Sequence, residues 1–176
     1  MFKIKYFLFL PFLFIVSCDY LTKDIKIDVD NFGLGNVSPN ALQPKNTSFD
    51  VSYDLLAKSM LLPEGTSLPI DQFGLSLFVE DVQAVKSNLP SGTKSIKTGE
   101  PIPLVSKVVI GQVTELASKI SDIALKDTWN YAVKGDVGVK GFNFPVNASK
   151  SMDSPFKAVK DQLPFSTDSI QNIWPF

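Results

Sequence analysis

Apolar and polar side chains alternate along most of the chain, and this period of two predicts β-strands. The clearest run is 73–79, where every second residue is large and apolar, and an extended stretch at 68–70 leads into it. Clusters of Gly, Pro, Asn and Ser predict turns between the runs, including breaks at 31–40 and 134–136. The predicted strands are 25–30, 49–55, 73–79, 82–86, 102–110, 129–133 and 137–146.

One stretch departs from this pattern and has the spacing of a helix. Over 113–124, apolar residues recur every three or four positions, opposite a side of Thr, Glu, Ser, Lys and Asp. We expect one amphipathic helix whose apolar side packs on the core, because its polar side lacks the many Lys residues of membrane-lying helices. A second, short helix is predicted to begin at Ser154 and Pro155, a favourable cap and first residue, and to end at Pro164.

Together these elements predict a mainly β fold. About seven short strands separated by turns are typical of an antiparallel β-sandwich of the immunoglobulin or fibronectin kind. The amphipathic helix would connect strands and cover an open edge or end of the sandwich. The residues expected on the inner face are Phe49, Val51, Tyr53, Phe73, Leu75, Leu77, Trp129 and Tyr131.

The first eighteen residues have the pattern of a secretory segment. Lys3 and Lys5 precede an apolar run over 6–16, which is too short to span about 30 Å of hydrocarbon as a helix. A plainly cleaved signal peptide would fit the length, but an Ala-x-Ala-like site is absent. The run ends at Ser17-Cys18, which resembles the lipobox of bacterial lipoproteins. This resemblance implies that Cys18, the only Cys of the chain, is acylated.

On this interpretation the chain has four parts: a lipoprotein signal peptide (1–17), a lipidated tether (18–23), a β-sandwich domain (24–151), and a C-terminal helix and tail packed on that domain (152–176). The expected location is the bacterial cell envelope, with the domain anchored through acyl chains on Cys18 and facing the periplasm or the cell surface. The choice between inner and outer membrane stays open.

Composition removes several classes of function. The chain has 17 basic and 18 acidic residues, and every basic residue is Lys. The charges form no basic block, so nucleic acid is not an expected partner. The chain has no His, which removes the commonest general base and metal ligand, and acylation of Cys18 would leave no thiol. We therefore expect no catalytic residue, no metal, no cofactor and no enzymatic activity.

The order of the parts resembles a known family. The stretch 68–70 (Leu-Pro-Ile) enters a long strand, the Gly- and Pro-bearing stretch 90–103 leads to an apolar strand, and an amphipathic helix precedes the patterns Tyr131-x-x-x-Gly135 and 144–146 (Phe-Pro-Val). This order resembles the type-2 late embryogenesis abundant family, whose core is the water-stress and hypersensitive-response domain. The likeness covers residues 25–151, although the family's Asn-Pro-Asn turn is replaced here by 61–67. It implies a folded, non-catalytic sandwich linked to desiccation and stress tolerance.

The last residues of the chain are unusually aromatic. Trp174 and Phe176 are candidates for contact with a partner protein, or for stapling the tail across the sandwich. Two classes of function therefore remain besides an enzyme. One is a stress-related envelope lipoprotein, and the other is an interaction or assembly module, or a carrier of a lipid. A cleft beside 113–124 would favour the carrier.

Overall fold

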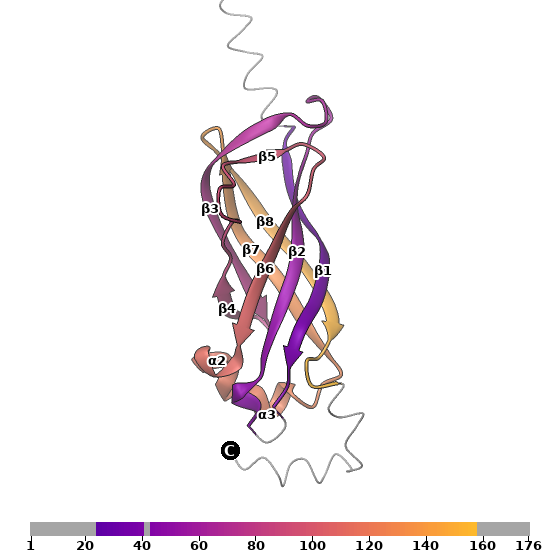
Figure 1. Cartoon of the computed structure of the whole chain (residues 1–176), viewed down its shortest axis with the longest axis vertical. Helices are drawn as coiled ribbons and strands as arrows, with labels where there is room; N and C mark the ends of the chain where they lie inside the picture. The colour runs from indigo at the N-terminus through magenta and orange to yellow at the C-terminus, as the bar shows by residue number, and fades with distance from the viewer. Residues whose placement is uncertain (1–23, 41–42, 158–176) are drawn as a thin grey trace, which may run out of the picture.

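The computed structural model describes residues 24–40 and 43–157, and its architecture is an antiparallel β-sandwich (Figure 1). One sheet has the strand order β1-β2-β6, and the other has the order β4-β3-β7-β8 with β5 paired to β3. The predicted fold class is confirmed, with one strand more than expected, the short β5. The strands are β1 (Lys26–Ser38), β2 (Ser48–Lys58), β3 (Ser67–Val79), β4 (Val82–Lys86), β5 (Ser95–Lys97), β6 (Ile102–Val109), β7 (Thr128–Val139) and β8 (Phe142–Asp153).

The core lies between the two sheets and is filled by the residues that alternation places there. Along β2, every second side chain is buried, and Phe49, Val51 and Leu55 have no exposed surface. The second half of β3 and the first half of β7 bury their alternate residues in the same way. Of the eight side chains predicted for the inner face, seven are buried, and Phe73 is half-buried against the core.

The break predicted at 31–40 is wrong, because β1 continues through it to Ser38. The strand accommodates the polar and Gly residues as two irregularities, between Asp30 and Gly33 and between Gly35 and Ser38. Asn31 and Asn36 have positive φ angles of 53° and 44°, which Asn tolerates better than most residues. The Asn31 amide donates to Asp54 (2.8 Å) and the Asn36 amide donates to Asp50 (2.6 Å), both in β2.

The turn predicted at 134–136 is also wrong, because β7 passes straight through it. Gly135 lies opposite both Leu75 of β3 and Val146 of β8, in the middle of the larger sheet. Its φ angle is 144°, and a Cβ atom added there would lie 2.0 Å from the carbonyl oxygen of Gly74. The glycine therefore permits a close approach of two strands, and it does not reverse the chain.

The single helix predicted over 113–124 is divided in two. A 3-10 turn, η2 (Ile110–Gln112), leads to α2 (Thr114–Ser118) and α3 (Ile120–Ile123), which meet at Lys119. The predicted burial of the apolar side is confirmed, since Leu116, Ile120 and Ile123 are buried in the core. These helices close one end of the sandwich (Figure 1). No helix within residues 24–40 and 43–157 is long and apolar enough to cross a membrane.

The chain reaches the same end again after β8. Pro155 and Phe156 are buried, and Phe156 packs against Trp129 with ring centroids 5.8 Å apart. Another 3-10 turn, η1 (Pro44–Asn46), also lies at this end and contacts η2. Most of the short helix predicted from Ser154 to Pro164 lies outside the described residues.

Replacing Gly135 with Ala tests the close approach of β3 and β7. We expect Gly135→Ala to lower the free energy of unfolding by about 2–4 kcal/mol, because the strained φ angle and the overlap with Gly74 add together. Gly35→Ala is the matched control, since a Cβ at Gly35 meets nothing within 4 Å. Chemical denaturation of both variants measures the difference, and equal stability would contradict this account of Gly135.

Candidate functional site

The residues singled out from the sequence lie outside the described part of the chain. Cys18 belongs to 1–23, and Trp174 and Phe176 belong to 158–176. A candidate site within the described residues must therefore come from the surface of the sandwich itself. One concave feature there is a groove between β1 and β8.

This groove, which we call the β1–β8 groove, exists because each sheet ends in an edge strand on the same side of the sandwich. β1 is the last strand of one sheet and β8 is the last strand of the other, and no described β-ladder joins them. The groove has a volume of about 550 Å³ and is open to solvent. We call the boundary at which an edge strand of one sheet faces an edge strand of the other a seam. Farther along this seam, the Lys150 ammonium donates to the carbonyl oxygen of Phe32 (3.4 Å), so that a polar contact joins the two strands there. The groove is lined by Ile27, Asp28, Val29, Asp30, Lys58, Pro145, Val146, Asn147 and Ala148.

The floor of the groove is apolar and its rim is charged. Ile27 and Val146 are 6% and 4% exposed and belong to the core, so they form the deepest part. On the rim, Lys58 Nζ lies 2.9 Å from Asp28 Oδ2. The hydrogen bond to Asp28 and its negative charge, with a smaller contribution from Asp30, raise the pKa of Lys58. Lys58 therefore stays charged, and the rim carries two carboxylates against one ammonium group.

The lining side chains favour binding over bond breaking. None of the nine is a Ser, Thr, Tyr, Cys or His, so the groove has no side-chain nucleophile of the hydroxyl or thiol kind and no imidazole base. Within residues 24–40 and 43–157, no group of three or more His, Cys, Asp or Glu is placed to hold a metal ion. Edge strands instead offer backbone N–H and C=O groups to an extended partner, with an apolar floor for its side chains.

The opposite seam, between β4 and β6, is filled by a buried cluster of hydroxyl groups. The Tyr53 hydroxyl hydrogen-bonds to the Ser87 hydroxyl and lies 3.2 Å from Ser106 Oγ. The two serine oxygens are 3.3 Å apart, and all three residues are buried. No base stands beside either serine in these contacts, so the cluster satisfies buried polar groups and joins the sheets.

A second buried tyrosine provides a contrast. The Tyr131 hydroxyl is buried and has no hydrogen-bond partner among the residues that the structure describes. Burial raises its pKa well above the usual value, with smaller contributions from the negative charges of Glu80 and Asp153, so the phenol stays protonated. Its ring packs edge-on against Phe49, with centroids 6.2 Å apart. Its role is therefore that of an apolar core residue.

The helical end, where a carrier would be expected to have its cleft, is filled by side chains. Leu116, Ile120 and Ala124 have no exposed surface, and Ile123 is 4% exposed. The Trp129 indole N–H donates to the carbonyl oxygen of Ile123 (2.7 Å), which fixes α3 to β7. The apolar side of these helices belongs to the core, and the groove lies elsewhere.

The groove could not be identified from the sequence. The alternation of Ile27 and Val29 with Asp28 and Asp30 marks one lining strand, but it has the appearance of an ordinary half-buried strand. Which strand lies across the gap depends on the order of strands in two sheets, and no local pattern encodes it. Two edge strands that lie side by side are the feature that sequence reasoning missed.

No protein-family model matches the sequence, and no curated protein or solved structure matches the chain. The resemblance to the type-2 late embryogenesis abundant family therefore stays a prediction.

The two buried tyrosines make a matched test of the hydroxyl cluster. We expect Tyr53→Phe to lower the free energy of unfolding by about 1–3 kcal/mol, because it removes a hydroxyl that Ser87 and Ser106 use. Tyr131→Phe removes a hydroxyl without a partner and should be neutral or stabilising by up to about 1 kcal/mol. Thermal and urea denaturation check both. A larger loss for Tyr131→Phe than for Tyr53→Phe would contradict this assignment.

Proposed function

We propose that this protein is a lipid-anchored, non-catalytic binding module of the bacterial cell envelope, and that its β1–β8 groove is the binding surface. The observation that carries the proposal is the open groove between the edge strands β1 and β8 of the sandwich. A volume of about 550 Å³ lies within the range of about 300–1,000 Å³ typical of sites for small ligands. It would also hold a few residues of an extended peptide.

The chemistry of the chain supports a role without catalysis. The sequence contains no His, and Cys18 would be used by the lipid. Three described serines are buried: Ser87 and Ser106 bond to each other and to Tyr53, and Ser154 accepts a hydrogen bond from the Phe156 N–H. The partner class that fits the groove is an extended, partly apolar segment of an envelope protein, which edge strands can bind through backbone hydrogen bonds.

A stress-related role is the second candidate, and the order of sequence parts that resembles the type-2 late embryogenesis abundant family favours it. A lipid cargo is a further possibility for the same groove, because Ile27 and Val146 give it an apolar floor. The open rim with its Asp28–Lys58 ion pair favours a polypeptide, since a lipid chain would be left partly in water.

The anchor is tested by replacing the acylated residue. In a bacterial host supplied with an alkyne-bearing palmitate analogue, we expect the wild-type chain to take up the label and to sediment with membranes. Cys18→Ser should abolish labelling and release the chain from the membrane, whereas Ser17→Ala, which keeps Cys18 and a small residue before it, should preserve both. Labelling that persists in Cys18→Ser would contradict the proposal.

The groove is tested by site-specific photocrosslinking in the same host. A photoreactive phenylalanine analogue at Asn147, which lines the groove, should give a product of defined mass, and Ala148→Trp, which fills the groove, should abolish it. Two controls come from the same strand. The analogue at exposed Asn143, outside the groove, should give no such product, and Ser151→Trp, which is exposed and lies farther along β8 outside the groove, should leave the Asn147 product intact.

Mass spectrometry of the crosslinked product identifies the class of partner. A polypeptide adduct would support the binding module, and an adduct of lipid mass would favour the carrier. The same pattern from Asn143 and Asn147, or an Asn147 product that Ala148→Trp leaves unchanged, would refute binding in the groove.

A further inference from the structure

The end of the sandwich at which β1 begins carries exposed apolar side chains on its connections. In the segment 59–66 between β2 and β3, Met60 is 92% exposed and Leu61 is 49% exposed, and Phe142 at the start of β8 is 42% exposed. Figure 1 shows both connections at the end opposite α2 and α3. Of the five large apolar side chains that are exposed among the described residues, three are at this end.

The chain enters the sandwich at the same place, through Asp24. The Asp24 carboxylate accepts hydrogen bonds from the Ser59 hydroxyl (2.8 Å), the Met60 N–H (2.5 Å) and the Leu61 N–H (2.9 Å). These hydrogen bonds, that from Ser59 foremost, lower the pKa of Asp24. The bonds are therefore present above the ordinary carboxyl pKa and are lost only as the pH falls through the lowered value. Asp24 is the first residue after the tether. Its hydrogen bonds therefore attach the tether directly to Met60 and Leu61, which we call the exposed apolar tip.

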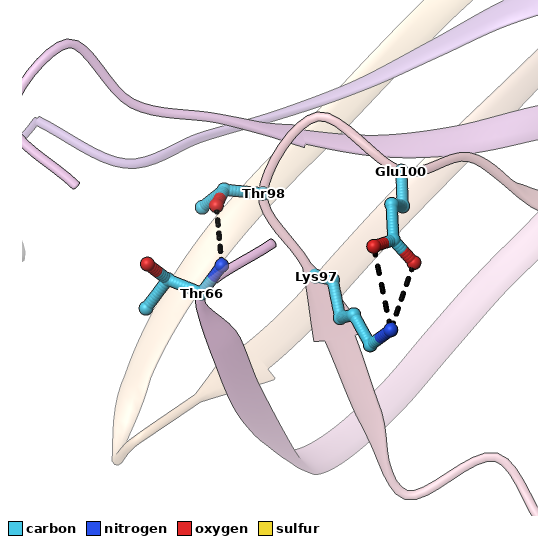
Figure 2. Close-up of polar contacts among 4 residues, drawn as sticks. All are labelled: Thr66, Lys97, Thr98 and Glu100. Atoms are coloured by element: carbon cyan, nitrogen blue, oxygen red, sulfur yellow. Dashed lines mark hydrogen bonds and ion pairs between the residues drawn. The ribbon is translucent and has the colours of Figure 1, made fainter. Parts of the chain in front are cut away.

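The other side of this connection is held to β5 and the turn after it. Thr98 Oγ1 donates to the carbonyl oxygen of Pro63 (2.6 Å) and accepts from the Thr66 N–H (3.0 Å), the second of which Figure 2 shows. The Gly65 N–H donates to the Thr98 carbonyl oxygen (2.8 Å). Met60 and Leu61 are therefore exposed from a connection that is fixed on both sides, and their exposure is built into the fold.

The length of the tether brings this tip close to the bilayer. Five residues separate Cys18 from Asp24, so the two Cα atoms are at most about 22 Å apart even when the tether is fully extended. The polar layer of a bilayer is itself roughly 5–8 Å thick on each side. If Cys18 is acylated, the tether is short enough to keep Asp24 and the Met60–Leu61 tip close to the bilayer, and any bend in it brings them to the headgroups.

The charges at this end point to an apolar contact rather than an electrostatic one. Lys97 Nζ lies 3.0 Å from Glu100 Oε2 (Figure 2), and Lys58 Nζ lies 2.9 Å from Asp28 Oδ2. Lys26, Lys94 and Lys140 also lie at this end, but so do the carboxylates of Asp24, Glu64 and Asp71, so the described residues leave little excess positive charge for anionic lipid. Burial of Met and Leu side chains in the headgroup and acyl boundary needs no such charge.

We propose that Met60 and Leu61 insert into the surface of the bilayer to which Cys18 is anchored and give the protein a second, non-covalent membrane contact. The sandwich is then held end-on, with Phe142 facing the same surface and with α2 and α3 farthest from it. This inference rests on the proposed lipid anchor. It also places the β1–β8 groove near the bilayer, since Lys58, one of its lining residues, directly precedes the 59–66 connection.

The test uses the full acylated chain and the fact that it has a single Cys. Because lipid would block Cys18, Met60→Cys gives one free thiol for an environment-sensitive fluorophore. Val105→Cys is the matched control, since Val105 is also an exposed apolar residue (64%) but lies on the outer face of β6. Gln112→Cys reports the helical end. Each labelled protein is reconstituted into vesicles of phosphatidylethanolamine and phosphatidylglycerol that contain lipid brominated on its acyl chains.

We expect the label at position 60 to shift its emission to the blue and to lose most of its intensity to bromine quenching, while labels at 105 and 112 are unchanged. Raising the salt concentration should leave the quenching at position 60 intact. A label at 60 that is quenched no more than that at 105, or stronger quenching at 105, would overturn the inference. Mass spectrometry of each sample reports acylation of Cys18 separately. An acylated chain with an unquenched position 60 overturns only this inference, and a chain without acyl groups overturns the anchor as well.

Discussion

The contact between Phe49 of β2 and the aromatic residues of β7 is the interaction on which the rest of the sandwich depends. Phe49 packs edge-on against Trp129 and Tyr131, with centroids 6.0 and 6.2 Å away, and so joins the two sheets. Trp129 in turn contacts Phe156 and donates its N–H to the Ile123 carbonyl, which attaches the C-terminal side of β8 and α3 to the same cluster. With no disulfide to help, burial of these rings carries much of the stability.

Filling one end and one seam of the sandwich determines where a surface for binding can remain. The aromatic cluster and the helices α2 and α3 close the helical end. The Tyr53, Ser87 and Ser106 hydroxyls close the seam between β4 and β6. The remaining seam joins two edge strands without a β-ladder and contains the groove. The function that we propose is therefore a consequence of topology, because any strand order that paired β1 with β8 would remove the groove.

Much of the fold could be predicted from the sequence. A strand that is buried on one face alternates apolar and polar residues, and this alternation can be recognised within a short stretch of sequence. This is why β2, the second half of β3 and their inner-face residues were predicted correctly. The errors at 31–40 and at Gly135 have one cause: Asn and Gly serve both in turns and within strands that bulge or approach closely. Only the neighbouring strand, Asp50 and Asp54 for the first and Gly74 for the second, decides between these uses. The groove depends on the same long-range information and could not be predicted at all.

The two ends of the sandwich differ in how many apolar side chains they expose to solvent. At the helical end, every large apolar side chain of α2 and α3 is covered, as expected of a surface that meets only water. At the other end, Met60 is 92% exposed on a connection that is held in place by hydrogen bonds to Asp24 and by hydrogen bonds with Thr98. A fixed connection could present a polar side chain at this position without any cost to those bonds, since they use the backbone of residue 60 and not its side chain. The fold therefore does not require an apolar residue there. The proposed membrane contact would use one, and the membrane to which Cys18 would be anchored is within reach of this end.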